Sequence, residues 1–152
     1  MSTSAEDREA FAAFLLRLRT KGIASKELVS AFESTPRRSF VPQRWQNVAW
    51  SERMIPIECG EAIEGADLQA MVVNSLAIEP GNRVLEIGTG SGFTAAVMSR
   101  PAGKVSTVER YKTLADLAKE RIEALGITNV QVRQADGANG LASEGPFDRI
   151  IV

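Results

Sequence analysis

The 152-residue sequence contains no histidine and a single cysteine, Cys59. The first absence excludes Ser-His-Asp and Cys-His catalysis, histidine zinc sites and histidine proton relays. The single cysteine excludes an internal disulfide and a cysteine zinc cluster. We therefore expect no metal site and a reducing compartment such as the cytoplasm. An enzyme built from this chain must therefore use chemistry that needs no imidazole.

Long apolar runs and a strong charge of one sign are also missing. No stretch approaches the roughly 20 apolar residues of a membrane-spanning helix. Because residues 6–9 are all charged, we expect neither a signal peptide nor a transmembrane segment. The formal net charge of -1 gives no basic field that would favour nucleic acid. With 44% hydrophobic and 24% charged residues, the composition is that of an ordinary globular domain.

The N-terminal part of the chain predicts helices followed by an ordered loop region. Apolar residues recur at helical spacing in 4–21 and again in 25–35. Residues 36–66 show no sustained period, but their aromatic and branched side chains are too apolar for a disordered linker. The basic pair Arg37-Arg38 in this region could contact an acidic ligand, but we expect it to be solvated or salt-bridged.

Helical and strand patterns alternate in the rest of the chain. A helix is expected over 68–77, with Asp67 as its cap and apolar residues such as Leu68 and Met71 on its buried face. The later elements are, in order, strand 83–87, helix 92–99, strand 104–109, helix 113–125 ended by Gly126, strand 129–133 and strand 147–152. Such alternation is typical of right-handed βαβ units on a parallel sheet.

The most informative motif is the glycine loop Gly88-Thr89-Gly90-Ser91-Gly92, between an apolar strand and a helix. Glycine permits backbone angles and close approaches to a ligand that a Cβ would forbid. The start of the following helix directs unpaired N–H groups and a positive dipole end at the same place. The segment therefore predicts a strand–loop–helix nucleotide site.

The spacing of the glycines separates two classes of ligand. The dinucleotide fingerprint is GxGxxG, and Phe93 stands where its third glycine should be, which disfavours NAD. Glu109, at the end of the next strand, can accept hydrogen bonds from ribose hydroxyls with either ligand. Asp136-Gly137 follows the third strand at the same sheet edge, where it could meet an adenine.

Glu86, just before the loop, favours a cationic ligand over a polyphosphate. S-adenosylmethionine carries a sulfonium and an ammonium group and lacks phosphates. Methyl transfer from it is a direct displacement, for which an enzyme mainly positions the partners and excludes water. A carboxylate acceptor is already ionised at neutral pH, so this reaction suits a chain without histidine.

Several ordered segments of the chain resemble the protein-L-isoaspartate (D-aspartate) O-methyltransferase family. The most specific is LEIGTGSGFTAAVMS at 85–99, which is similar to the family's LEIGTGSGYQAAVLA. Upstream, TPRRSFVP at 35–42 resembles its VPRxxFVP, and 49–57 resembles its AYxD…LPI. PFDRIIV at 146–152 continues the match. The resemblance covers nearly the whole chain.

The resemblance implies an S-adenosylmethionine-dependent O-methyltransferase that methylates the α-carboxylate of isoaspartyl residues in damaged proteins. It implies an α/β fold with the Rossmann-like class I methyltransferase sheet, helices on both faces, and parallel strands in the order 3-2-1-4. We expect a single domain over 1–152, divided into an N-terminal helical and loop extension (1–66) and a truncated cofactor-binding portion (67–152). The C-terminal strands of the family are absent, and the open sheet edge could form a homodimer.

The resemblance also implies roles for individual residues. The glycines would contact the methionine part of the cofactor, Glu109 its ribose and Asp136 its adenine. The full set of expected cofactor-binding residues is Glu86, Gly88, Thr89, Gly90, Ser91, Gly92, Glu109, Asp136 and Gly137.

The chain departs from the family in one loop, GEAIEGA at 60–66. Glu64 stands where the family has a serine or threonine near the transferred methyl group. Two like charges 4 Å apart repel by roughly 4 kcal/mol at an effective dielectric of 20, so Glu64 would oppose an isoaspartyl carboxylate. Two alternatives therefore stay open. One is a divergent O-methyltransferase for another acceptor, with Glu64 as a catalytic residue, and the other is a non-catalytic cofactor-binding module.

Overall fold

The computed structural model describes residues 5–152, which form an α/β fold around a four-stranded parallel sheet. The spatial order of the strands is β5-β4-β3-β6, so the predicted order 3-2-1-4 is confirmed. The strands are β3 (Arg83–Ile87), β4 (Lys104–Glu109), β5 (Val130–Gln134) and β6 (Arg149–Ile151).

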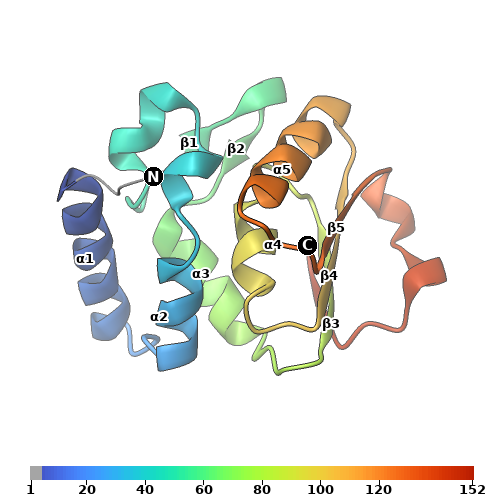
Figure 1. Ribbon diagram of the computed structural model, residues 1–152, viewed down its shortest axis with the longest axis horizontal. Coiled ribbons are helices and arrows are strands. Elements are labelled where there is room, and N and C mark those ends of the chain that lie inside the picture. The colour runs from blue at the N-terminus through green and yellow to red at the C-terminus, as the bar shows by residue number, and fades with distance from the viewer. Residues whose placement is uncertain (1–4) are drawn as a thin grey trace.

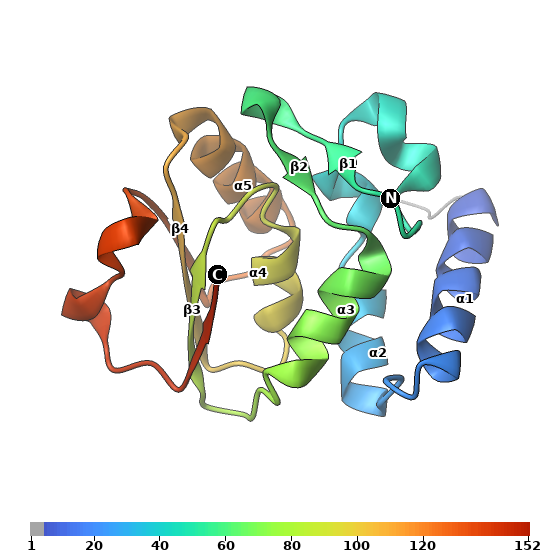
Figure 2. The same ribbon diagram turned by 180° about the vertical axis from the view of Figure 1, so that it is seen from behind.

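Helices α4 (Phe93–Met98) and α5 (Lys112–Ala124) lie on one face of this sheet (Figures 1 and 2). The segment that carries two short 3-10 helices, Gly137–Asn139 and Ala142–Glu144, lies on the other. Gly126 ends α5 as predicted, with a φ of 66° that suits glycine. Both βα units therefore have the layout that the alternating sequence predicts.

The N-terminal part begins with the two predicted helices, α1 (Ala5–Thr20) and α2 (Lys26–Glu33). Residue 4, the first of the predicted helix 4–21, lies outside the described residues. The predicted loop region contains the 3-10 helices Arg37–Phe40, Gln43–Val48 and Glu58–Gly60. A small antiparallel pair, β1 (Ile55–Pro56) and β2 (Ala62–Ile63), brackets the last of these helices.

Helix α3 (Ala66–Ser75) corrects two expectations. Its N-cap is Gly65, and Asp67 instead accepts ion pairs from Arg17 and Lys21 of the α1 region at 2.8 and 2.6 Å. Its buried face consists of Ala66, Ala70 and Val73, among others. Leu68 and Met71 are 50% and 45% exposed. Because α3 packs against α1 and α4, its inner face uses small residues, and the larger apolar ones lie outside.

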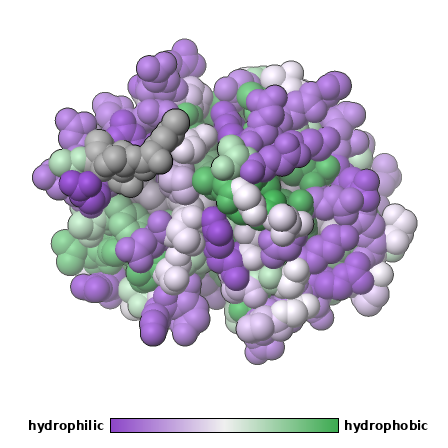
Figure 3. All heavy atoms as spheres, in the orientation of Figure 1, coloured by the Kyte–Doolittle hydropathy of each residue, from purple (hydrophilic) through white to green (hydrophobic). Residues whose placement is uncertain are grey.

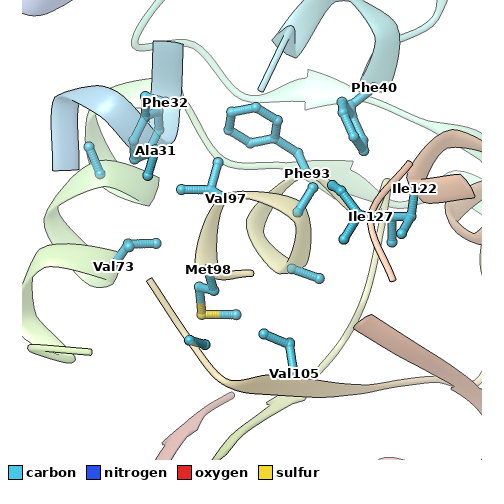
Figure 4. Close-up of a cluster of buried hydrophobic side chains, with 14 of the residues drawn as sticks. Ala31, Phe32, Phe40, Val73, Phe93, Val97, Met98, Val105, Ile122 and Ile127 are labelled. Carbon is cyan, nitrogen blue, oxygen red and sulfur yellow. The ribbon is translucent and has the colours of Figure 1, made fainter. Parts of the chain in front are cut away.

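One hydrophobic core joins the N-terminal helices to the sheet. Phe93 lies near its centre, with ring centroids 5.8 Å from Phe32 and 5.5 Å from Phe40 (Figure 4). The residue that breaks the dinucleotide fingerprint is therefore a core residue that anchors α4 against the N-terminal part.

The outer face is mainly hydrophilic in the view of Figure 3, with apolar atoms gathered in smaller areas. Within residues 5–152, no helix combines the length and apolar character needed to cross a membrane.

Candidate functional site

A cavity of about 550 Å³ opens at the carboxyl ends of β3, β4 and β5. This is the edge at which open α/β sheets bind ligands. Of the residues predicted for the site, those that line it are Glu64, Glu86, Gly88, Gly90, Glu109, Asp136 and Gly137. Thr89, Ser91 and Gly92 are not among the lining residues.

Glu109 holds the glycine loop in place. Its Oε2 accepts the Gly90 N–H at 2.9 Å and its Oε1 accepts the Tyr111 N–H at 3.0 Å. The Gly88 N–H donates to the Val108 carbonyl at 2.8 Å, which ties the start of the loop to β4. With φ values of 95° and 54°, Gly88 and Gly90 adopt the left-handed region that these contacts require. The loop is thus preorganised, and each Glu109 oxygen keeps a lone pair for a ligand.

Gly92 lies behind the loop, where α4 meets α5. A Cβ at this position would lie 3.0 Å from the Cβ of Ala118, which is tighter than nine in ten real Cβ contacts. The neighbouring Ser91 is also buried, and its carbonyl accepts a hydrogen bond from Arg121 at 3.2 Å. Both residues shape the loop from its inner side.

Glu86 is buried against the cavity and is held by a pair of threonines. The Thr107 hydroxyl donates to Glu86 Oε2 at 2.6 Å, and Thr89 lies 2.6 Å from the same hydroxyl. Because Thr107 gives its proton to Glu86, Thr89 donates to Thr107. Burial raises the pKa of Glu86 to about 8, and the charges of Glu64 and Glu109 act in the same direction. Sequence reasoning missed Thr107, although a polar residue inside a buried strand was a usable signal.

The loop after β5 closes one end of the cavity, the end at which the sequence predicts an adenine. Asp136 Oδ1 accepts the Ala138 N–H at 3.0 Å, which caps the short 3-10 helix that follows. A Cβ on Gly137 would lie 2.4 Å from Ile87 Cγ2, so only glycine fits there. The Asp136-Gly137 pair therefore packs directly against the end of β3.

Arg37 supports the opposite wall and overturns the expectation of a solvated or salt-bridged side chain. It is 0% exposed, and its guanidinium lies 4.6 Å from the centroid of the Phe93 ring. It donates to the Ala49 carbonyl at 2.5 Å, to the Glu64 carbonyl at 2.7 Å and to Gln69 Oε1. Burial lowers its pKa to about 9. Three neutral acceptors from separate segments replace water around this cation.

Gln69 and Thr94 were also missed by sequence reasoning. Gln69 is buried on α3, and its Nε2 donates to Thr94 Oγ1 of α4 at 3.0 Å. Both side chains line the cavity. The available signal was a glutamine within an otherwise apolar helical stretch.

Glu64 lines the cavity as an exposed residue beside this wall. Its backbone carbonyl is fixed by Arg37, whereas its carboxylate forms no ion pair with any residue between 5 and 152. The carboxylate therefore adds negative charge to the cavity, and the nearby cation that acts on it electrostatically is the buried Arg37.

The comparison with protein families agrees with this arrangement. The model of the protein-L-isoaspartate(D-aspartate) O-methyltransferase family matches residues 9–152. The chain belongs to this family. A protein-L-isoaspartate O-methyltransferase of Rhizobium meliloti is 50% identical over 90% of this chain and 67% of its own length. One from Maricaulis maris is 43% identical over 91% of this chain and 65% of its own.

Solved structures share the fold. A protein-L-isoaspartate O-methyltransferase superposes with a TM-score of 0.78 and 29% identity, over 93% of this chain and 47% of that one. A Plasmodium falciparum structure in complex with S-adenosyl-L-homocysteine superposes with a TM-score of 0.74 and 20% identity, over 91% and 71%. The present chain thus spans about two thirds of the length of the curated relatives it matches.

Proposed function

We propose that the protein is an S-adenosylmethionine-dependent protein-L-isoaspartate O-methyltransferase that methylates the α-carboxylate of isoaspartyl residues in damaged proteins. The observation that carries the proposal is the carboxylate-lined cavity at the glycine loop, in a chain of this family. The names of its relatives support the acceptor, and the ligand of the Plasmodium falciparum structure supports the cofactor.

The residues of the cavity fit such a cofactor. Glu86 and Glu109 face the cavity, and neither forms an ion pair in the described part of the chain. A ligand with a sulfonium and an ammonium group would supply the missing positive charge. A volume of about 550 Å³ lies within the usual range for small-molecule sites. When bound, S-adenosylmethionine supplies an electrophilic methyl group that an ionised carboxylate can accept without a base.

The residues of the chain act by binding and positioning. Gly88 and Gly90 let the backbone approach the methionine part, Glu109 accepts from the ribose hydroxyls, and Asp136 with Gly137 borders the adenine. Glu86 lies next to the cationic end, whose positive charge would favour release of the Glu86 proton and leave a negative carboxylate there. Thr89, Ser91 and Gly92 contribute by fixing the shape of the loop. The cavity wall excludes water from the acceptor and the methyl group.

Methyl incorporation tests the proposal. We expect labelled S-adenosylmethionine to transfer its methyl group to an isoaspartyl peptide and not to the same peptide with a normal aspartyl residue. The Glu109→Gln variant should bind S-adenosylhomocysteine at least about tenfold more weakly, because the amide oxygen and nitrogen cannot accept both backbone N–H groups. Failure of the full-length protein to methylate the isoaspartyl peptide would refute the proposed activity.

The unpaired carboxylate of Glu64 favours a second candidate, an O-methyltransferase for a different acceptor. A cationic group on the acceptor would neutralise Glu64, and a hydroxyl acceptor could use it as a base. The Glu64→Ser variant separates the two candidates. If the acceptor is a carboxylate, removal of the like charge should raise the methylation rate by about tenfold or more. A lower rate with this variant would favour the second candidate.

We further propose that the protein is cytoplasmic, acts on polypeptides rather than nucleic acid, and forms a homodimer through the edge of the sheet at β6. Ile150 on this strand is 57% exposed, which supports an edge contact. Sedimentation across a concentration series should give a dimer for the wild type and a weaker one for Ile150→Lys. A wild type that stays monomeric throughout would contradict the dimer.

A further inference from the structure

Gln69 and Thr94 form a polar pair on the cavity wall to which the proposed function gives no role. Gln69 comes from α3 and Thr94 from the first turn of α4. Around them the wall is apolar, formed by Leu68 and Val72 of α3. A glutamine buried among apolar side chains loses free energy unless its polar atoms are satisfied, so its partners fix how it is oriented.

Arg37 determines the direction of the hydrogen bonds in this pair. A guanidinium only donates, so the Gln69 atom that faces Arg37 must be the amide oxygen. The amide nitrogen then donates to Thr94 Oγ1, 3.0 Å away. The usual ambiguity between the two ends of a glutamine amide is thereby removed. Since Gln69 has no further acceptor for it, the proton of the Thr94 hydroxyl is left for another partner.

The structure offers that proton no acceptor within the described chain. Between residues 5 and 152, the Thr94 hydroxyl makes no hydrogen bond other than the one it accepts from Gln69. Thr94 is partly exposed, and its exposed side lines the cavity. A hydroxyl that already accepts a hydrogen bond from an amide becomes a better donor, because hydrogen bonds in a chain polarise one another.

The main-chain donors of the glycine loop in the cavity are already used within the chain. The N–H groups of Gly88 and Gly90 are already bound to the Val108 carbonyl and to Glu109. On the opposite wall, Arg110 donates to the Tyr111 hydroxyl at 2.7 Å. The lining carboxylates only accept when ionised. The Thr94 hydroxyl, which has no acceptor among residues 5–152, is therefore a donor that a ligand carboxylate next to α3 can use.

We propose that Thr94 donates a hydrogen bond to a ligand carboxylate, and that Gln69 and Arg37 are positioning residues that orient its hydroxyl for this task. The inference rests on the proposed function and deepens it. The carboxylate belongs either to the methionine end of the cofactor or to the isoaspartyl acceptor. Both present the same chemistry to Thr94, so the experiment has one arm for each.

Calorimetric titrations of the Thr94→Val and Thr94→Ser variants test the proposal. The first arm measures binding of S-adenosylhomocysteine, with 5′-methylthioadenosine, which lacks the amino-acid carboxylate, as the matched ligand. The second arm measures binding of an isoaspartyl peptide to the protein saturated with S-adenosylhomocysteine. A hydrogen bond to a charged group predicts that Thr94→Val weakens binding about tenfold to a hundredfold in one arm. Thr94→Ser keeps the hydroxyl and should restore binding.

The role of Gln69 is tested by Gln69→Glu, alone and combined with Thr94→Val. A glutamate keeps a partner for Arg37 but cannot donate, so the Thr94 hydroxyl must give it the proton instead. If Gln69 acts through Thr94, the double variant should bind as weakly as Thr94→Val alone. If the losses of binding in the two single variants add up in the double variant, the new glutamate acts through its charge alone. That result would overturn the positioning role of Gln69. Thermal unfolding of each variant identifies any that fail to fold, and Thr94→Ala, which also lacks the hydroxyl, replaces Thr94→Val in that case.

The outcomes separate this inference from the proposed function. Weaker binding of S-adenosylhomocysteine with unchanged 5′-methylthioadenosine assigns Thr94 to the cofactor carboxylate. Weaker binding of the peptide alone assigns it to the acceptor. If the wild type binds both ligands and Thr94→Val binds them equally well, only the inference is overturned. If the wild type binds neither S-adenosylhomocysteine nor the peptide, the proposed function falls and the inference falls with it.

Discussion

The two walls of the cavity are held by different kinds of contact. On the wall of the glycine loop, main-chain N–H groups are fixed by a carbonyl and by the Glu109 carboxylate, all within the β3–β4 unit. On the α3 wall, the long Arg37 side chain gathers three polar groups, one from residue 49 and two from the 64–69 segment. The first wall follows from a short stretch of sequence, whereas the second exists only in the folded chain. Substitutions on the two walls should therefore lower the free energy of unfolding by different amounts.

The largest effect is expected on the α3 wall, from Arg37→Met. The methionine would leave the Ala49 and Glu64 carbonyls and Gln69 Oε1 without their donor in a buried site. We expect a loss of about 3 kcal/mol in the free energy of unfolding, measured by urea denaturation. Arg53→Met, at an exposed position, should change it by less than about 0.5 kcal/mol. Equal losses in the two variants would show that the buried contacts contribute nothing.

On the glycine-loop wall, Gly92→Ala should lower the free energy of unfolding by less, about 2 kcal/mol. Its φ of 88° disfavours alanine, and the new Cβ would crowd Ala118 at 3.0 Å. Gly126→Ala is the matched control, because φ is 66° there but no atom lies within 4 Å of the added Cβ. It should cost about 1 kcal/mol, from the backbone alone. The difference between the two variants measures the packing of α4 on α5.

Glu86 makes the glycine-loop wall sensitive to pH. The folded protein holds a proton on Glu86 up to a pKa of about 8, whereas the unfolded chain releases it near 4.5. The free energy of unfolding should therefore fall as the pH rises from 4.5 to 8, by at least about 1 kcal/mol from this group. Glu86→Gln cannot titrate and should lose less stability over the same range. Parallel pH profiles for the two proteins would contradict the buried, protonated state.

The smallest effect is expected outside the cavity, where Lys21 pairs with Asp67 at the start of α3. Lys21→Met should lower the free energy of unfolding by only about 0.5 kcal/mol, because the lysine side chain is partly exposed. The loss should shrink in high salt, which screens the pair. Lys112→Met, which breaks an exposed pair with Asp116, is the control and should leave the free energy of unfolding unchanged. A loss that is independent of salt would point to packing instead.

The parts of the fold that follow from short-range patterns were predictable. The strand order, the α/β layout and the end of α5 at Gly126 depend on alternation and on local backbone chemistry, and the structure confirms them. The prediction of which face of α3 is buried was wrong. That face depends on how closely α1 and α4 approach α3, which periodicity does not reveal. The division of the single domain at residues 66 and 67 stays a prediction.

The site divides in the same way. Glu86, Glu109 and Asp136 were found because strand ends in such a sheet have a known geometry, and all three line the cavity. Their roles toward a cofactor stay predictions. Gln69 and Thr94 were missed because their pairing depends on Arg37, which lies far from both in the sequence. Contacts of this kind follow from tertiary packing and leave little trace in local spacing.

The burial of Arg37 also has a consequence for the order in which the chain assembles. A guanidinium stripped of water is tolerated only when its acceptors are in place, and these come from residues 49, 64 and 69. An intermediate that buries Arg37 with only one of these acceptors pays for desolvation without compensation. The segments around Arg37 should therefore dock together as one cooperative unit, and amide hydrogens of the 64–69 segment should exchange with solvent at the same rate as those of 37–40.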